Sequence, residues 1–258
     1  MRYSTLPPPE PALGVYHHGA DARACIVFVH GLGGDPWRTW GEHACGAALP
    51  FRLAQNWPRI AALYVDYPAA PAALLAHGGN AASTLALALA RLLAAHALQQ
   101  YAQVILVGHC FGGHLCQRAV RYLLENADAR TPAPRRLALV LIDSPEAWRP
   151  GFPATAGERR VANLADALGL GREALDASLA WWCARDGPAG AVSTHAIVSA
   201  WTNWVTPLMP GASIPSERHH VLPIVHEALG QVAADGPDQC YQIVHAVVAQ
   251  RLTTADGA

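Results

Sequence analysis

The chain has 258 residues, of which 52% are hydrophobic and 14% are charged, and its formal net charge is −1. This length allows one α/β domain with a large core, so we expect a single domain over 1–258. The basic and acidic residues almost balance, which leaves no charge excess of the kind that nucleic acids or anionic membranes attract, and we expect neither as a partner.

Six cysteines are scattered along the chain, with no Cys-x-x-Cys pair and no zinc spacing. Scattered thiols in a long chain are typical of free, buried cysteines in a reducing compartment. Residues 1–13 are rich in proline and lack the apolar core of a signal peptide. The most apolar stretch, 81–98, is interrupted by polar side chains and is interpreted as a soluble helix. We therefore expect a cytoplasmic protein with no transmembrane segment, metal or cofactor.

Apolar runs and helical repeats alternate through most of the chain. They predict an edge strand at 15–18, core strands at 24–29, 60–67, 104–107 and 137–142, and a late strand at 197–206. Helices are predicted at 50–56, 81–99, 114–125 and 241–251. This alternation indicates an α/β fold with a mostly parallel, doubly wound sheet.

Residues 149–190 interrupt that alternation. Prolines and a glycine lead into an amphipathic stretch, 159–182, which ends in the pair Trp181 and Trp182. One interpretation is a helical lid over the site, with the tryptophans lining it. The other is that the insertion simply packs on the sheet edge.

A reactive side chain stands where a predicted strand turns into a predicted helix. Residues 104–113 read Val-Ile-Leu-Val-Gly-His-Cys-Phe-Gly-Gly, which places Cys110 inside a Gly-x-Cys-x-Gly turn. This resembles the nucleophile elbow of the α/β-hydrolases, in which the central residue is usually serine. The unpaired amides and the dipole of a helix N-terminus favour a thiolate there, so Cys110 is the candidate nucleophile.

A second motif follows the strand at 24–29, where residues 30–34 read His-Gly-Leu-Gly-Gly. In the α/β-hydrolase fold this loop and the residue after the nucleophile each supply one backbone N–H to the oxyanion. The resemblance therefore implies Leu32 and Phe111 as the oxyanion donors. His30, Gly31 and His109 are expected to border the substrate.

The base should be a histidine near the C-terminus, because this fold orders its partners as nucleophile, acid and histidine. The candidates are His219, His220 and His226. Residues 216–220 are predicted to form a polar loop, whereas His226 falls in an apolar run. We choose His220, and a pair of surface histidines without a role is the alternative.

Asp143 is the candidate acid, because it follows the strand at 137–142 at the edge of the sheet where functional side chains gather. The end of the late strand holds no carboxylate. Asn203 lies there and is the alternative, since Cys–His–Asn constellations exist.

Residues 27–40, with His-Gly-Leu-Gly-Gly followed by Thr-Trp, resemble the oxyanion segment of the serine-active-site-containing (SERAC-type) lipase-like hydrolases. Residues 108–113 match the family's Gly-His-Ser-x-Gly-Gly with cysteine in place of serine. The order of Val205-Thr206-Pro207, His220 and Tyr241 is similar to the family's C-terminal order.

The resemblance implies an enzyme that acts on acyl esters or thioesters through an acyl-enzyme intermediate, with an apolar or lipid-like substrate. Cysteine at position 110 favours thioester chemistry or acyl transfer, as in the cysteine-elbow dienelactone hydrolases and polyhydroxyalkanoate synthases. A non-catalytic ligand-binding homologue is the alternative, and a laboratory replacement of serine by cysteine would leave the same sequence.

Overall fold

The computed structural model describes residues 10–41, 48–76, 80–126, 137–144, 147–148, 163–171, 177, 180–182, 192–200, 205–206, 214, 216–224, 226–229 and 238–253. Seven strands form one sheet in the order β1-β3-β2-β4-β5-β7-β9. Their bounds are β1 (Ala12–His18), β2 (Ala24–Val29), β3 (Ile60–Asp66), β4 (Gln103–His109), β5 (Leu137–Ile142), β7 (Val192–Ser199) and β9 (His219–Leu222).

Every strand pairs in parallel with its neighbours except β1, which is antiparallel to β3 at one edge. A separate antiparallel pair joins β6 (Ala147–Trp148) to β8 (Val205–Thr206). Because parallel strands all end at the same edge, the residues that follow β2, β4, β5 and β9 are brought together.

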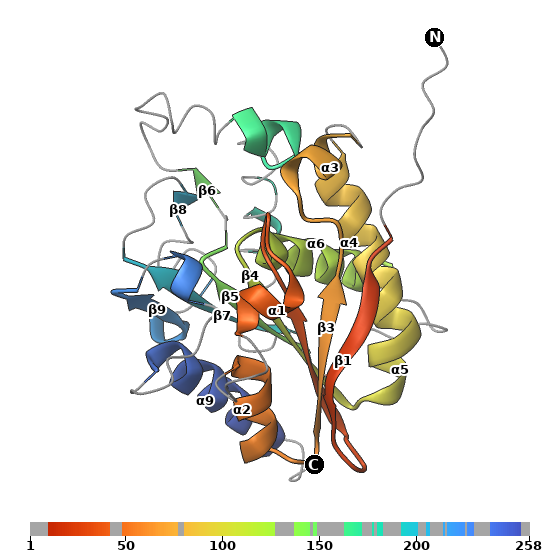
Figure 1. The fold of residues 1–258 in the computed structure, drawn as a ribbon, viewed down its shortest axis with the longest axis vertical. Coiled ribbons are helices and arrows are strands. Elements are labelled where there is room, and N and C mark those ends of the chain that lie inside the picture. Colours follow the sequence, from red (N-terminus) through yellow and green to blue (C-terminus); the bar gives the residue numbers. More distant parts are fainter. Residues whose placement is uncertain are drawn as a thin grey trace.

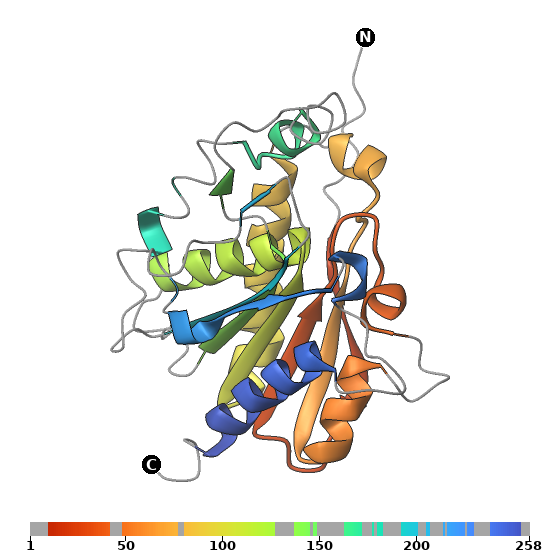
Figure 2. The same ribbon diagram turned by 90° about the vertical axis from the view of Figure 1, so that its left-hand side faces the viewer.

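Helices cover both faces of the sheet (Figure 1). One face carries α4 (Ala81–Leu92), the π-helical turn η2 (Leu93–Ala97), α5 (Leu98–Gln100) and α6 (Phe111–Glu125). The other carries α2 (Leu49–Asn56) and α9 (Gln239–Thr253), as Figure 2 shows from the side. Short helices α1 (Pro36–Trp40) and α3 (Pro71–Leu75) lie in loops, and single turns η3 (Ser216–Arg218) and η4 (His226–Ala228) flank β9.

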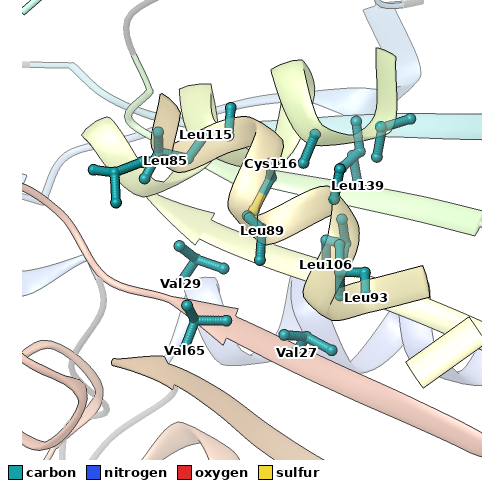
Figure 3. Packing of buried hydrophobic residues seen from close by; sticks show 14 of the residues in the cluster. Val27, Val29, Val65, Leu85, Leu89, Leu93, Leu106, Leu115, Cys116 and Leu139 are labelled. Carbon is teal, nitrogen blue, oxygen red and sulfur yellow. The ribbon is translucent and has the colours of Figure 1, made fainter. Parts of the chain in front are cut away.

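The central strands are apolar at every position because both of their faces are covered. In β2, Val27 and Val29 pack under α4 and α6, whereas Ile26 and Phe28 pack on the α2 and α9 side. Figure 3 shows the first of these layers. The α/β-hydrolase fold expected from the sequence is confirmed.

The apolar stretch Ala81–Gln100 is long and apolar enough to span a membrane when judged by length and composition alone. In the structure Leu85 and Leu89 are buried in the core against the sheet and α6. This packing is that of a helix in the core of a domain.

The structure corrects two predictions near the C-terminus, the bounds of a strand and the extent of a loop. The late strand, predicted at 197–206, runs from Val192 to Ser199, and the predicted polar loop at 216–220 contains the start of β9. β9 has only four residues and begins with two histidines, so neither apolar content nor alternation marked it as a strand.

Candidate active site

Cys110 occupies the turn between β4 and α6 in a backbone conformation that side-chain-bearing residues rarely adopt, with φ 53° and ψ −125°. Such a conformation costs about 1–3 kcal/mol and persists only where the surroundings hold it. Glycines provide the space: a Cβ on Gly108 would lie 2.4 Å from the Gly113 Cα, and one on Gly112 would lie 2.3 Å from the His30 carbonyl oxygen. The turn from β4 into α6 is thus tight, and the glycines on either side of Cys110 allow it.

Asp143 follows β5, the strand that pairs with β4, and its φ is also positive, at 47°. The Cys110 N–H donates to the Ile142 carbonyl oxygen at 2.8 Å, which ties the elbow to the end of β5. The Asp143 side chain is 1% exposed, and its Oδ1 accepts a hydrogen bond of 3.1 Å from the Ser199 N–H. The carboxylate is therefore fixed at the edge of the sheet where β4, β5 and β7 end.

His226 lies on the turn η4, four residues after β9 ends. Its Nδ1 donates to Asp143 Oδ2 at 2.6 Å, and its side chain is also hydrogen-bonded to that of Cys110. Burial alone would lower the pKa of His226, but the hydrogen bonds to Asp143 and Cys110 raise it to about 10. Thiol, imidazole and carboxylate thus form one connected chain.

The structure corrects the choice of histidine. His220 lies on β9 beside Ile197, where it borders a groove between the edge strands and α9, and the imidazole that meets Asp143 is that of His226. The rule that functional groups follow the carboxyl ends of parallel strands would have selected His226, had β9 been recognised as the last strand. The sequence thus failed to reveal the short edge strand β9, and the choice of histidine depended on that strand.

Of the predicted oxyanion donors, Phe111 directly follows Cys110 and Leu32 lies in the loop after β2. Phe111 begins α6, so its N–H is one of the four in the first turn without an acceptor inside the helix. The loop that contains Leu32 passes close to the elbow, since a Cβ on Gly31 would lie 2.8 Å from the Cys110 Cβ. Leu32 and Phe111 both pack in the apolar cluster that contains Cys110.

The two histidines that we expected beside the substrate have other neighbours. The His30 imidazole is fully buried and stacks on the Tyr67 ring, with centroids 4.3 Å apart. His109, 7% exposed, shares a hydrogen bond of 3.0 Å between its Nε2 and the His226 carbonyl oxygen. The structure thus places His30 against Tyr67 and His109 against the main chain of His226.

The described residues contain no group of three or more His, Cys, Asp or Glu side chains that could hold a metal ion. Cys25, Cys110, Cys116 and Cys240 are free and buried.

Some sequence expectations lie outside the described residues, among them Asn203 and most of the insertion 149–190. Where the insertion is described, Leu168 and Trp182 are buried and belong to the same apolar cluster as the buried residues of α4 and α6. Trp181 lies near Arg121 of α6, whose guanidinium carbon is 5.4 Å from the centroid of the indole ring. These described parts pack on the domain, and a lid over the site stays a prediction.

Comparison with known proteins places these features in a family. Residues 26–253 match the model of the Alpha/beta hydrolase family. No curated protein sequence matches the chain.

Solved structures share the fold at low sequence identity. An esterase from Thermogutta terrifontis, Est2 with bound propionate, is 16% identical with a TM-score of 0.51, over 95% of this chain and 89% of its own. A protein from Agrobacterium vitis S4 described as a hydrolase is 19% identical with a TM-score of 0.59, over 93% of each chain. The type II thioesterase BorB of the borrelidin biosynthetic cluster is 20% identical with a TM-score of 0.52, over 93% of this chain and 96% of its own.

Proposed function

Because this chain belongs to the alpha/beta hydrolase family, we propose that it cleaves acyl thioesters or esters through a covalent intermediate on Cys110. The observation that carries the proposal is the connected chain of Cys110, His226 and Asp143, with 2.6 Å between His226 Nδ1 and Asp143 Oδ2. A nucleophile, a base in hydrogen-bond reach and a third group that orients the base are what acyl transfer requires.

The first half of the reaction forms the acyl-enzyme. With a pKa of about 10, His226 carries the proton at neutral pH, and the Cys110 sulfur forms a bond to the carbonyl carbon while an electron pair moves onto the carbonyl oxygen. The N–H groups of Leu32 and Phe111 bind that oxyanion, and loss of one such donor typically costs about 3 kcal/mol. When the intermediate collapses, the bond to the leaving group breaks and His226 gives that group its proton.

The second half releases the acyl group. Water gives a proton to His226 as its oxygen bonds to the acyl carbon, and the carbon–sulfur bond to Cys110 breaks to yield the free acid. The sulfur again stands beside protonated His226. A thiol or alcohol that takes the place of water gives acyl transfer by the same steps.

Two features favour thioesters with an apolar acyl group. A thiolate leaves more readily than an alkoxide, so a sulfur nucleophile exchanges most easily with another thioester. The side chains of Leu32 and Phe111 pack in the apolar core that also includes Cys110, and such apolar neighbours suit an aliphatic acyl chain. The fold neighbours include an esterase with bound propionate and a type II thioesterase, which is consistent with this substrate class.

The proposal is tested with a matched pair of substrates, the butyryl thioester of N-acetylcysteamine and the butyryl oxyester of N-acetylethanolamine. We expect intact-mass analysis to show a butyryl adduct on Cys110, faster turnover of the thioester, and loss of both in Cys110→Ala. Cys110→Ser separates the geometry of the elbow from the chemistry of sulfur, because it should shift the preference toward the oxyester.

Product analysis identifies the acceptor. Free butyrate indicates a hydrolase, whereas exchange into an added thiol without free acid indicates an acyltransferase. If the wild-type protein forms no adduct and turns over neither substrate faster than Cys110→Ala, while butyryl compounds still stabilise it against heat, the protein binds ligands without catalysis and the proposal is wrong.

A further inference from the structure

His109 ends β4, directly before Cys110, and makes a contact that joins two distant parts of the chain. Its Nε2 lies 3.0 Å from the carbonyl oxygen of His226, 117 residues away, and the two imidazole centroids are 4.7 Å apart. A carbonyl oxygen can only accept, so Nε2 of His109 carries the hydrogen and donates it. The bond is between the His109 side chain and the His226 main chain, not between the two rings.

The His109 ring is enclosed on its other sides. Trp40 packs edge-on against it, with centroids 6.3 Å apart, and a Cβ on Gly31 would lie 3.2 Å from the His109 Nδ1. The ring therefore fills the space between residues 30–34, which we call the oxyanion loop, and η4, the turn that carries His226.

The protonation state of His109 suits a permanent donor. Burial and the neighbouring His226 lower the pKa of His109 to about 4, against smaller opposing effects of the bond to the His226 carbonyl and of Asp143. His30 is a further titratable neighbour and also lowers this pKa. His109 is consequently neutral at physiological pH, and its single ring proton resides on Nε2.

The position of His226 explains why such a bond would matter. His226 belongs to a three-residue turn that follows a four-residue edge strand, so its own secondary structure is short. Cys110 and His109, in contrast, lie at the end of a fully buried central strand. The hydrogen bond from His109 therefore ties the turn that carries His226 to β4, the strand that leads into Cys110.

On these contacts we propose that His109 is a positioning residue, which holds the main chain of His226 so that its imidazole stays opposite the Cys110 sulfur. This inference depends on the proposed function, since it assigns a role within that site. It replaces the expectation that His109 contacts the substrate.

The inference is tested with substitutions that keep or remove the donor. Gln places its amide nitrogen near the position of Nε2, whereas the shorter Asn places it near Nδ1, out of reach of the His226 carbonyl. His109→Phe removes the donor but keeps a ring. His245→Phe is the matched control, because His245 lies on α9 against Trp57 and Tyr241.

We measure the rate of Cys110 alkylation by iodoacetamide, and kcat and KM with p-nitrophenyl butyrate. Displacement of a catalytic group by about 1 Å can cost about 100-fold, so we expect His109→Asn and His109→Phe to lower alkylation and kcat by about 10- to 100-fold with little change in KM. His109→Gln and His245→Phe should stay close to wild type. Thermal melting and circular dichroism establish that each variant is folded.

Each outcome has one meaning. If folded His109→Asn alkylates as fast as His109→Gln, the positioning role is wrong, and the Gln and Asn pair decides the matter even when His109→Phe does not fold. A rise in KM with alkylation unchanged shows substrate contact instead and also overturns the inference. If wild-type protein alkylates no faster than His226→Gln, it is the proposed function that fails, whatever the His109 variants do.

Discussion

The strongest local constraints in the site fall on Cys110 and Asp143, two residues with side chains that both adopt positive φ at the ends of neighbouring parallel strands. Each is held by a main-chain hydrogen bond to the next strand, from the Cys110 N–H to Ile142 and from the Asp143 N–H to Ile197. These bonds offset the strain and set the directions of the two side chains. The Cys110 thiol and the Asp143 carboxylate thereby lie at the same edge of the sheet, where β4 and β5 end.

His226 and His220 make a matched pair for testing which histidine is the base. We expect His226→Gln to lower kcat for p-nitrophenyl butyrate by about 10²- to 10⁴-fold, the usual contribution of a general base. His220→Gln should stay near wild type, because His220 borders the groove between β9 and α9. Steady-state kinetics on both variants checks this, and a larger loss in His220→Gln would restore the sequence-based choice.

At the scale of elements, the site depends on how closely β2, β4 and α6 approach one another. Gly112 lies in the first turn of α6, and a Cβ there would lie 2.3 Å from the carbonyl oxygens of both Val29 and His30. Since those oxygens belong to backbone, neither can move aside like a flexible side chain. The glycine therefore allows α6 to begin directly against the oxyanion loop.

Gly112→Ala should consequently destabilise the protein by about 3 kcal/mol, the upper part of the range for overpacking. Gly33→Ala is the control: it faces open space, and its φ of +68° costs only the strain of the left-handed region, about 1 kcal/mol. Urea unfolding of the two variants gives the comparison. An equal or smaller loss for Gly112→Ala would mean that α6 and the loop are less tightly packed than the structure shows.

For the molecule as a whole, buried histidines make stability depend on pH in two directions. Burial is the main reason that the pKa values of His109 and His195 fall to about 4. The positive charges of nearby Arg218 and Arg251 further lower the pKa of His195. The pKa of His226 is instead raised to about 10. An unfolded histidine titrates near 6.5.

The sign of each effect follows from which state binds more protons. Between about pH 6.5 and 4 the unfolded chain takes up protons that His109 and His195 cannot, so stability falls as the pH is lowered. Between 6.5 and 10 the folded chain keeps the proton of His226, so its contribution is lost as the pH rises. We expect the free energy of unfolding to be greatest near pH 6.5.

Urea unfolding between pH 4 and pH 10 measures this profile. His195→Gln should flatten the acid side, and His226→Gln the alkaline side, because each removes one of the groups responsible. A wild-type profile that keeps rising from pH 7 to pH 10 would contradict the pairing of His226 with Asp143.

The amino-acid sequence by itself determined the parts of this protein that depend on contiguous residues. The core strands 24–29 and 137–142 match β2 and β5 residue for residue, because buried parallel strands are apolar throughout. The glycine-flanked turn around Cys110 and the strand end at Asp143 were equally local, since each follows a strand that the sequence marks clearly.

Tertiary structure alone decided which histidine meets Asp143. β9 exists because its backbone completes the sheet edge beside β7, and four residues beginning with two histidines carry no strand pattern of their own. That pairing puts His220 on the edge strand and His226 on the turn beyond it, next to the ends of β4 and β5. The physical reason is that strand pairing is a non-local contact. It can fix the position of a short segment whose own residues do not specify a strand.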